Sequence, residues 1–327
     1  MEFVTRLASR QSDPAYPLEV NGPAAWESVT DATVVTWRCR VQLPSMPGDH
    51  IVVPSFAHLG AAHDERYRFV LRTEACAFWL NPVPGSAPAT IKSTPANATR
   101  HKVTCHIDCW HTHGALEAPL VELLVEADSP PANHLLIVSA RPLELPGNLG
   151  APGHPDIELE VPASISQMQA DNTIKGRICS PTALAMAMSA VTKTPQWQAT
   201  IDACYDPLTR AYGAWPLAIR WAGQQGVLAG VEALSGWRDA LRVLEAGSPL
   251  VCSIRFEKNA LNGAPMQSTS GHLVLLYGIK GDYVYIKDPA AARDSEVDRR
   301  YRVDEFSAAW LQRRGAAYIF TPGAAGN

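Results

Sequence analysis

A change in the spacing of apolar residues near residue 145 is the feature that most constrains how this chain can fold. The segment LPGNLGAPGHP at 145–155 contains three Pro, three Gly and almost no periodicity, which is typical of a linker. Short apolar or alternating runs precede it and predict strands at 32–43, 66–74, 76–83, 101–111 and 133–143. We therefore expect a β-sandwich or jelly-roll-like accessory domain at 1–145 and a linker at 146–157.

The remainder, residues 158–327, has a different pattern. Apolar residues at helical spacing predict helices at 180–191, 209–226 and 237–247, and Pro216 should start or bend the second of these. Apolar runs then predict strands at 249–256, 272–279, 283–289 and 316–322. Because helices come first and antiparallel strands later, we expect an α+β fold. A chain of 327 residues is long enough for two such domains.

Composition excludes several kinds of partner. The net charge is −4 and no basic block stands out, so nucleic acid is not an expected partner. No apolar run reaches about 18–20 residues, so we expect no membrane span.

The seven cysteines are odd in number and irregularly spaced, unlike a disulfide framework. Free thiols and the lack of a signal peptide pattern favour the cytoplasm. A secreted or periplasmic location is the alternative if a signal has been removed.

Cys179 precedes a run of small and apolar residues, SPTALAMAMSAV. Ser180 is a suitable N-cap and Pro181 a suitable first helical residue, which places Cys179 just outside a helix N-terminus. The positive end of the helix dipole favours a thiolate there, and the thiolate is the nucleophilic form. A buried thiol at the start of a core helix is the alternative interpretation.

His272 and Asp288 are brought together by a predicted hairpin. The run GHLVLLYGIKGDYVYIKDP turns near Lys280-Gly281-Asp282, so residue 272 should lie across from residues 288–290. A carboxylate beside an imidazole fixes its tautomer and raises its basicity. Taken alone, Asp288 is also an ordinary strand-ending residue before proline.

Two glutamines upstream of Cys179 could stabilise an oxyanion. Gln167 and Gln169 both lie in PASISQMQADN, and a side-chain amide acting with the backbone N–H of Cys179 is a suitable donor pair. On this pattern alone, a solvated loop residue is the simpler interpretation of either glutamine.

Together these segments resemble a known family, the papain-like cysteine peptidases of the bacteriocin-processing, double-glycine leader peptidase-like superfamily. The resemblance covers about residues 158–322. The segments that carry it are VPASISQ (161–167), CSPTALAMAM (179–188), GHLVLLYGI (271–279) and YIKDP (285–289). It implies a papain-like domain and a cysteine peptidase that acts on a peptide or protein substrate through an acyl-enzyme, with no cofactor.

The same resemblance implies a role for each site residue. Cys179 would be the nucleophile, His272 the general base and acid, and Asp288 the group that orients His272. Gln167 would be the oxyanion donor in preference to Gln169, because the family glutamine follows the small residue of an SQ pair. The family usually has Gly after the cysteine, whereas this chain has Ser180, which either crowds the cleft or caps the helix.

Two other functions stay open. One is a related acyl transfer with the same residues, such as deamidation, transamidation or hydrolysis of a non-peptide amide. The other is a catalytically silent peptide-binding protein.

The segment CHIDCWHTH suggests metal binding, since Cys105, Cys109, His111 and His113 would share one face of a strand. A continuous strand would spread them over roughly 25 Å, so ordinary strand packing is expected and no metal site is predicted.

Overall fold

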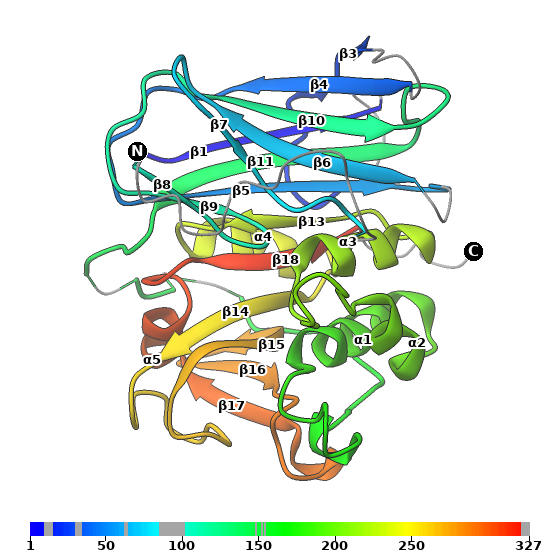
Figure 1. Cartoon of the computed structure of the whole chain (residues 1–327). Coiled ribbons are helices and arrows are strands. Elements are labelled where there is room, and N and C mark those ends of the chain that lie inside the picture. The colour runs from blue at the N-terminus through cyan, green and yellow to red at the C-terminus, as the bar shows by residue number, and fades with distance from the viewer. Residues whose placement is uncertain are drawn as a thin grey trace.

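The computed structural model describes residues 1–9, 16–29, 35–61, 65–84, 102–147, 149–151, 153 and 155–321. Strands β1–β11 form the N-terminal half, and helices α1–α5 lie among strands in the C-terminal half (Figure 1). The prediction of an α+β chain is therefore confirmed. In the described part of the chain, no helix is both long and apolar enough to cross a membrane.

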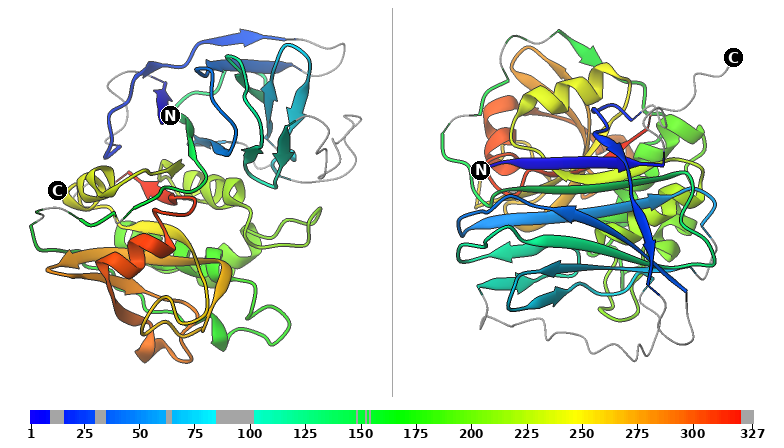
Figure 2. Two further views of the ribbon diagram at one scale, coloured as in Figure 1. Left: turned by 90° about the vertical axis from the view of Figure 1, so that its left-hand side faces the viewer. Right: turned by 90° about the horizontal axis from the view of Figure 1, so that it is seen from above.

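The N-terminal half consists of two stacked sheets (Figure 2). The six-stranded sheet, in spatial order, contains β2 (Gly22–Pro23), β1 (Phe3–Ala8), β11 (His134–Pro142), β5 (His50–His58), β9 (Trp110–Thr112) and β8 (Val103–Cys105). The five-stranded sheet contains β3 (Trp26–Ser28), β4 (Thr36–Gln42), β10 (Leu120–Glu126), β6 (Arg66–Arg72) and β7 (Ala77–Trp79).

The six-stranded sheet is buried on both faces. Along β5, Val52 and Phe56 pack between the two N-terminal sheets. The alternate residues Ile51 and Val53 pack against the C-terminal half, because successive strand residues point to opposite faces. Because both faces of β5 are buried, its sequence is apolar at consecutive positions and does not alternate between apolar and polar residues. The sequence pattern did not predict β5, which also contains Pro54 in its interior.

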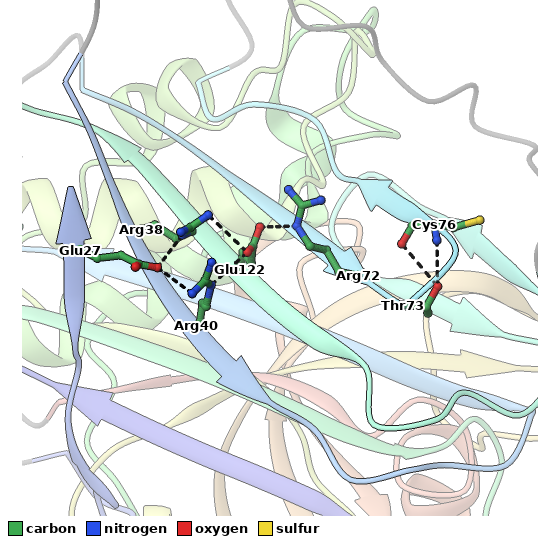
Figure 3. Close-up of polar contacts among 7 residues, drawn as sticks. All are labelled: Glu27, Arg38, Arg40, Arg72, Thr73, Cys76 and Glu122. Atoms are coloured by element: carbon green, nitrogen blue, oxygen red, sulfur yellow. Dashed lines mark hydrogen bonds and ion pairs between the residues drawn. The ribbon is translucent and has the colours of Figure 1, made fainter. Parts of the chain in front are cut away.

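The outer face of the five-stranded sheet carries a charge network. Glu122 of β10 is buried beneath three arginines, Arg38, Arg40 and Arg72 (Figure 3). Arg38 and Arg40 also contact the exposed Glu27 of β3, at 2.6 and 3.0 Å. Arg38 and Arg40 are thus each shared between two carboxylates, and the three arginines together offset the cost of burying Glu122.

In the part of the C-terminal half that the structure describes, one sheet is combined with five α-helices. The seven-stranded sheet contains β13 (Ala229–Ala233), β18 (Ala316–Phe320), β14 (Leu250–Phe256), β15 (Thr269–Lys280), β16 (Tyr283–Lys287) and β17 (Asp298–Arg302), and β12 (Ile157–Glu158) pairs with β15. The helices are α1 (Cys179–Thr192), α2 (Trp197–Ala203), α3 (Trp215–Gln224), α4 (Trp237–Glu245) and α5 (Val303–Ala309). Two short 3-10 helices span Gln167–Gln169 and Asp294–Glu296.

The edge of this sheet is covered by the N-terminal half. β13 pairs with β18 on one side only. The N–H groups of Val231 and Ala233 instead donate to the hydroxyls of Ser55 and Ser139, at 2.9 and 3.0 Å. An exposed strand edge invites unwanted pairing, so these two serines satisfy donors that would otherwise be left unpaired in the interior.

Several predicted elements need correction. The helix predicted at 209–226 begins only at Trp215, because Pro216 occupies the first turn. The strand predicted at 101–111 is two strands, β8 and β9. Residues 32–34 of the first predicted strand and residues 148, 152 and 154 of the predicted linker lie outside the described residues.

Candidate active site

Cys179 is the first residue of α1, not the residue before it. Ile178 occupies the N-cap position and makes no side-chain capping bond. The prediction that Ser180 caps the helix is wrong: its buried hydroxyl lies 2.8 Å from the Tyr318 hydroxyl of β18. A tertiary partner far along the chain replaces the local cap. Ser180 therefore points into the core rather than into a cleft, and Cys179 still lies at the positive end of the helix.

The β15–β16 hairpin places His272 beside Asp288. Lys280 pairs with Tyr283 across a two-residue turn, and Leu275 pairs with Lys287. Asp288 follows β16 directly, and its Oδ1 lies 2.7 Å from Nε2 of His272. Both side chains are buried, so their contact is little weakened by solvent.

Asp288 makes two further contacts that hold it in place. Its Oδ2 accepts a hydrogen bond from the Tyr301 hydroxyl at 2.7 Å, and its Oδ1 accepts one from the Ala290 N–H at 3.0 Å. Tyr301 lies on β17, which the sequence pattern did not predict. An alternating RYRV segment before a helix was the only signal that could have revealed it.

The half-buried thiol of Cys179 lies near enough to the His272 ring for each group to shift the pKa of the other. Since Nε2 faces Asp288, the other ring nitrogen, Nδ1, is the one left for sulfur. Burial raises the pKa of Cys179, but His272 and the N–H groups of Leu273 and Ser180 outweigh burial and leave that pKa below its ordinary value. The pair can therefore exist as thiolate and imidazolium near neutral pH.

The two partners of His272 act on its pKa in the same direction. Burial lowers the pKa of His272, but Asp288 and Cys179 raise it, with a net result of about 10. Burial likewise raises the pKa of Asp288, and His272, Tyr301 and the Ala290 N–H lower it to below the ordinary range. A charged His272 is thus stabilised from both sides.

Gln167 and Gln169 lie in different environments. Gln167 is only 5% exposed, whereas Gln169 faces solvent. The backbone N–H of Gln167 donates to the carbonyl of Pro289 at 2.8 Å, and its Nε2 donates to the carbonyl of Lys175 at 2.7 Å. The residue is therefore anchored to the loop that follows Asp288 and to the segment that leads to Cys179.

The segment 105–113 does not form the continuous strand that we expected. β8 and β9 form a hairpin in which Cys105 pairs with Trp110 and Thr104 with His111. The His106 and His111 rings lie 4.0 Å apart between centroids. Among the described residues, no group of three or more His, Cys, Asp or Glu side chains could hold a metal ion.

Comparisons with known proteins bear on the C-terminal half. Residues 158–318 match the model of the Peptidase C39 like family. No curated protein matches the chain. Among solved structures, a double glycine motif protease from an AMS/PCAT transporter, in complex with the leader peptide, is 20% identical with a TM-score of 0.34. A structure named as a C39-like peptidase from Bacillus anthracis is 18% identical with a TM-score of 0.39. Each alignment covers 51% of this chain and 97% of the other.

The family match spans the segments that contain Gln167, Cys179, His272 and Asp288. It ends within β18, the strand that contacts Ser180. Residues 158–318 of this chain therefore belong to the Peptidase C39 like family.

Proposed function

We propose that this chain is a cysteine peptidase that cleaves peptide bonds through an acyl-enzyme. Cys179 is the nucleophile, His272 the general base and acid, Asp288 the residue that orients His272, and Gln167 the oxyanion donor. The observation that carries the proposal is the buried contact between His272 and Asp288 at 2.7 Å, with Cys179 close enough to His272 for its pKa to be lowered, because a nucleophile, a base and an orienting group are what such chemistry needs.

The proposed reaction has two stages. The thiolate of Cys179 attacks the carbonyl carbon of the scissile bond, and the imidazolium of His272 gives its proton to the leaving nitrogen. His272 then removes a proton from water, which attacks the thioester and releases the acid and the thiolate. Asp288 accepts from Nε2 throughout, so the other ring nitrogen faces the reacting atoms.

The tetrahedral intermediate needs donors for its oxyanion. The Gln167 Nε2 has two hydrogens, and the Lys175 carbonyl accepts one of them. The second hydrogen and the backbone N–H of Cys179 are the donors that we assign to the oxyanion. Gln167 is the better candidate of the two glutamines because its buried amide is already fixed in place.

The N-terminal residues 1–145 would serve as an accessory domain, joined by a linker at 146–157 to the catalytic domain at 158–327. Its six-stranded sheet packs against β13 and α3. We propose that it holds the catalytic domain in its active arrangement and contributes a wall beside it.

Iodoacetamide labelling at pH 6 tests the nucleophile directly. An ordinary thiol has a pKa of about 8.5 and reacts slowly at that pH. Cys179 should be alkylated much faster than Cys76, the other half-buried cysteine, as measured by peptide mass mapping. The His272→Ala variant should lose this difference.

Equal, slow labelling of Cys179 and Cys76 in the unaltered protein would exclude an activated pair and favour a silent binding protein. If labelling is selective, a peptide library identifies the cleaved sequence. Trapping of the acyl group by added amine, in place of water, would instead indicate transamidation.

A further inference from the structure

A pocket of about 520 Å³ lies at the junction between the two halves of the chain. On the N-terminal side it is lined by residues 48–50, by His111 of β9 and by the chain that follows β11. On the other side it carries Arg255 of β14 and two arginines that follow α5, Arg313 and Arg314. We call this site the junction pocket.

Two of the three arginines keep unused donors. Arg313 donates to Glu144 at 3.0 Å. Arg255 and Arg314 make no side-chain hydrogen bond or ion pair with any other residue that the structure describes. A guanidinium has five N–H donors, no acceptor and a permanent charge, so these two side chains are suited to accept an anionic ligand from solvent.

The nearby carboxylates do not use up these donors. The lining contains two acids, Asp49 and Glu144, and Glu144 is engaged with Arg313. Asp108 lies near Arg314, but its Oδ2 accepts the Trp215 N–H at 3.3 Å. Burial raises the pKa of Asp108 to about 6, against the opposing effects of that N–H and of Arg314. Among the described residues, no ion pair or hydrogen bond joins Asp108 to Arg314.

His111 adds a third polar group from the opposite wall. Its Nε2 is buried and has no hydrogen-bond partner among the described residues. Burial, the neighbouring His106 and Arg314 lower the pKa of His111 to about 3, so the ring is neutral. A neutral imidazole can donate one hydrogen bond to a ligand oxygen, and an unpartnered buried nitrogen is costly without one.

Arg255 ties the pocket to the sheet of the C-terminal half. It lies on β14, the strand that pairs with β15, and it is exposed whereas its neighbour Ile254 is buried.

We propose that the junction pocket binds an oxyanion group, a carboxylate or a phosphate, through Arg255 and Arg314. Both side chains come from the C-terminal half, and His111 closes the site from the N-terminal half. The bound group is held across the junction, and its source is either a free small anion or an acidic residue of a bound peptide.

Isothermal titration calorimetry with inorganic phosphate and with succinate tests this site. The full chain carrying Cys179→Ala is used, so that the result does not depend on the proposed peptidase activity. At least one anion should bind saturably. Arg255→Gln and Arg314→Gln should each weaken binding by about tenfold or more, because each removes charge-assisted hydrogen bonds. Arg238→Gln, which removes an exposed arginine on α4 outside the pocket, should leave binding unchanged.

A peptide arm identifies the source of the oxyanion. A glutamate-containing peptide that competes with the anion, while its glutamine counterpart does not, assigns the site to an acidic peptide residue. Anion binding without competition assigns it to a free small anion. The proposal is overturned if neither anion binds saturably, or if binding survives both substitutions in proteins whose thermal unfolding is unchanged. Arg314→Lys, which keeps the charge but loses the forked donor, gives a second variant if Arg314→Gln unfolds.

Discussion

Arg6 and Glu232 form a buried bidentate ion pair between the two halves of the chain. The guanidinium Nε and Nη2 lie 2.8 and 2.6 Å from the carboxylate oxygens of Glu232, although 226 residues separate the two in sequence. The Tyr16 hydroxyl donates to the same carboxylate at 2.8 Å. The two halves thus share a polar interior as well as an apolar one.

Glu232→Gln should lower the free energy of unfolding by about 3–5 kcal/mol, because it leaves the charge of Arg6 buried without its counter-ion. Urea unfolding monitored by tryptophan fluorescence measures the change. Glu27→Gln, which alters a solvent-facing carboxylate paired with Arg38, is the matched control and should change stability far less. Equal losses in the free energy of unfolding would show that the buried ion pair stabilises the protein no more than the exposed one does.

Gly230→Ala should destabilise the same interface. A Cβ at this position would lie 2.2 Å from Cδ1 of Ile137 and 3.2 Å from the Tyr16 hydroxyl, so the buried Ile137 side chain would have to change its conformation within a packed interface. We expect a loss of about 1–3 kcal/mol, typical of overpacking. Gly22→Ala adds a methyl group where no atom lies within 4 Å and serves as the control. A stable Gly230→Ala protein would mean that the two halves are not packed so closely.

Tyr301→Phe should slow the alkylation of Cys179 at pH 6 without abolishing it. Loss of the hydroxyl removes one of the groups that lower the pKa of Asp288, which weakens the support of Asp288 for the charged His272. A rise of one unit in the thiol pKa would reduce the thiolate population about tenfold, and we expect a decrease of up to that size.

The control for Tyr301 is Tyr277→Phe. The Tyr277 hydroxyl donates to Asp298, at 3.1 Å, and not to Asp288. Its removal should leave the labelling rate unchanged. Equal rates in the two variants would argue that Tyr301 has only a structural role.

The pH dependence of Cys179 alkylation follows from the directions of the two pKa shifts. The lowered pKa of Cys179 means that the thiolate persists above that value and is lost as the pH falls through it. The raised pKa of His272, about 10, means that the imidazolium persists to alkaline pH. The rate should therefore begin to rise at a lower pH than that of an ordinary thiol and should be nearly constant between the pKa of Cys179 and that of His272.

Cys76, the other half-buried cysteine, provides the comparison in the same protein. In His272→Ala, Cys179 stays buried but loses the imidazolium that offsets the effect of burial, so the pKa of Cys179 should rise. Its pH profile should then approach that of an ordinary thiol. A profile for Cys179 that already matches that of Cys76 would contradict the assignment.

Gln167→Ala should separate oxyanion stabilisation from activation of the nucleophile. For a peptide selected from the library, kcat should fall by about 10²–10³, whereas the rate of alkylation of Cys179 should remain unchanged. Gln169→Ala, two residues away and exposed, should affect neither quantity. A large effect of Gln169 and none of Gln167 would reverse the assignment of the oxyanion donor.

Local sequence patterns were sufficient where one segment determines its own structure. The helix over residues 180–191 follows from short-range rules, although its start does not. The end of α4 just before Gly247, where φ is +83°, follows from them as well. The β15–β16 hairpin also depends on a short turn, so the contact between His272 and Asp288 could be anticipated from the spacing of the two residues.

The sequence by itself therefore determined the α+β class, the change of pattern near residue 145 and the proximity of His272 to Asp288. Only the tertiary structure decided that Ser180 bonds to Tyr318, that Tyr301 reaches Asp288 and that Ser55 and Ser139 cover the edge of β13. It also decided that β5 is buried on both faces. The physical reason is that these partners are far apart in the chain. The residues near a hydrogen-bonding group or an apolar face do not indicate which distant element will bond to that group or cover that face.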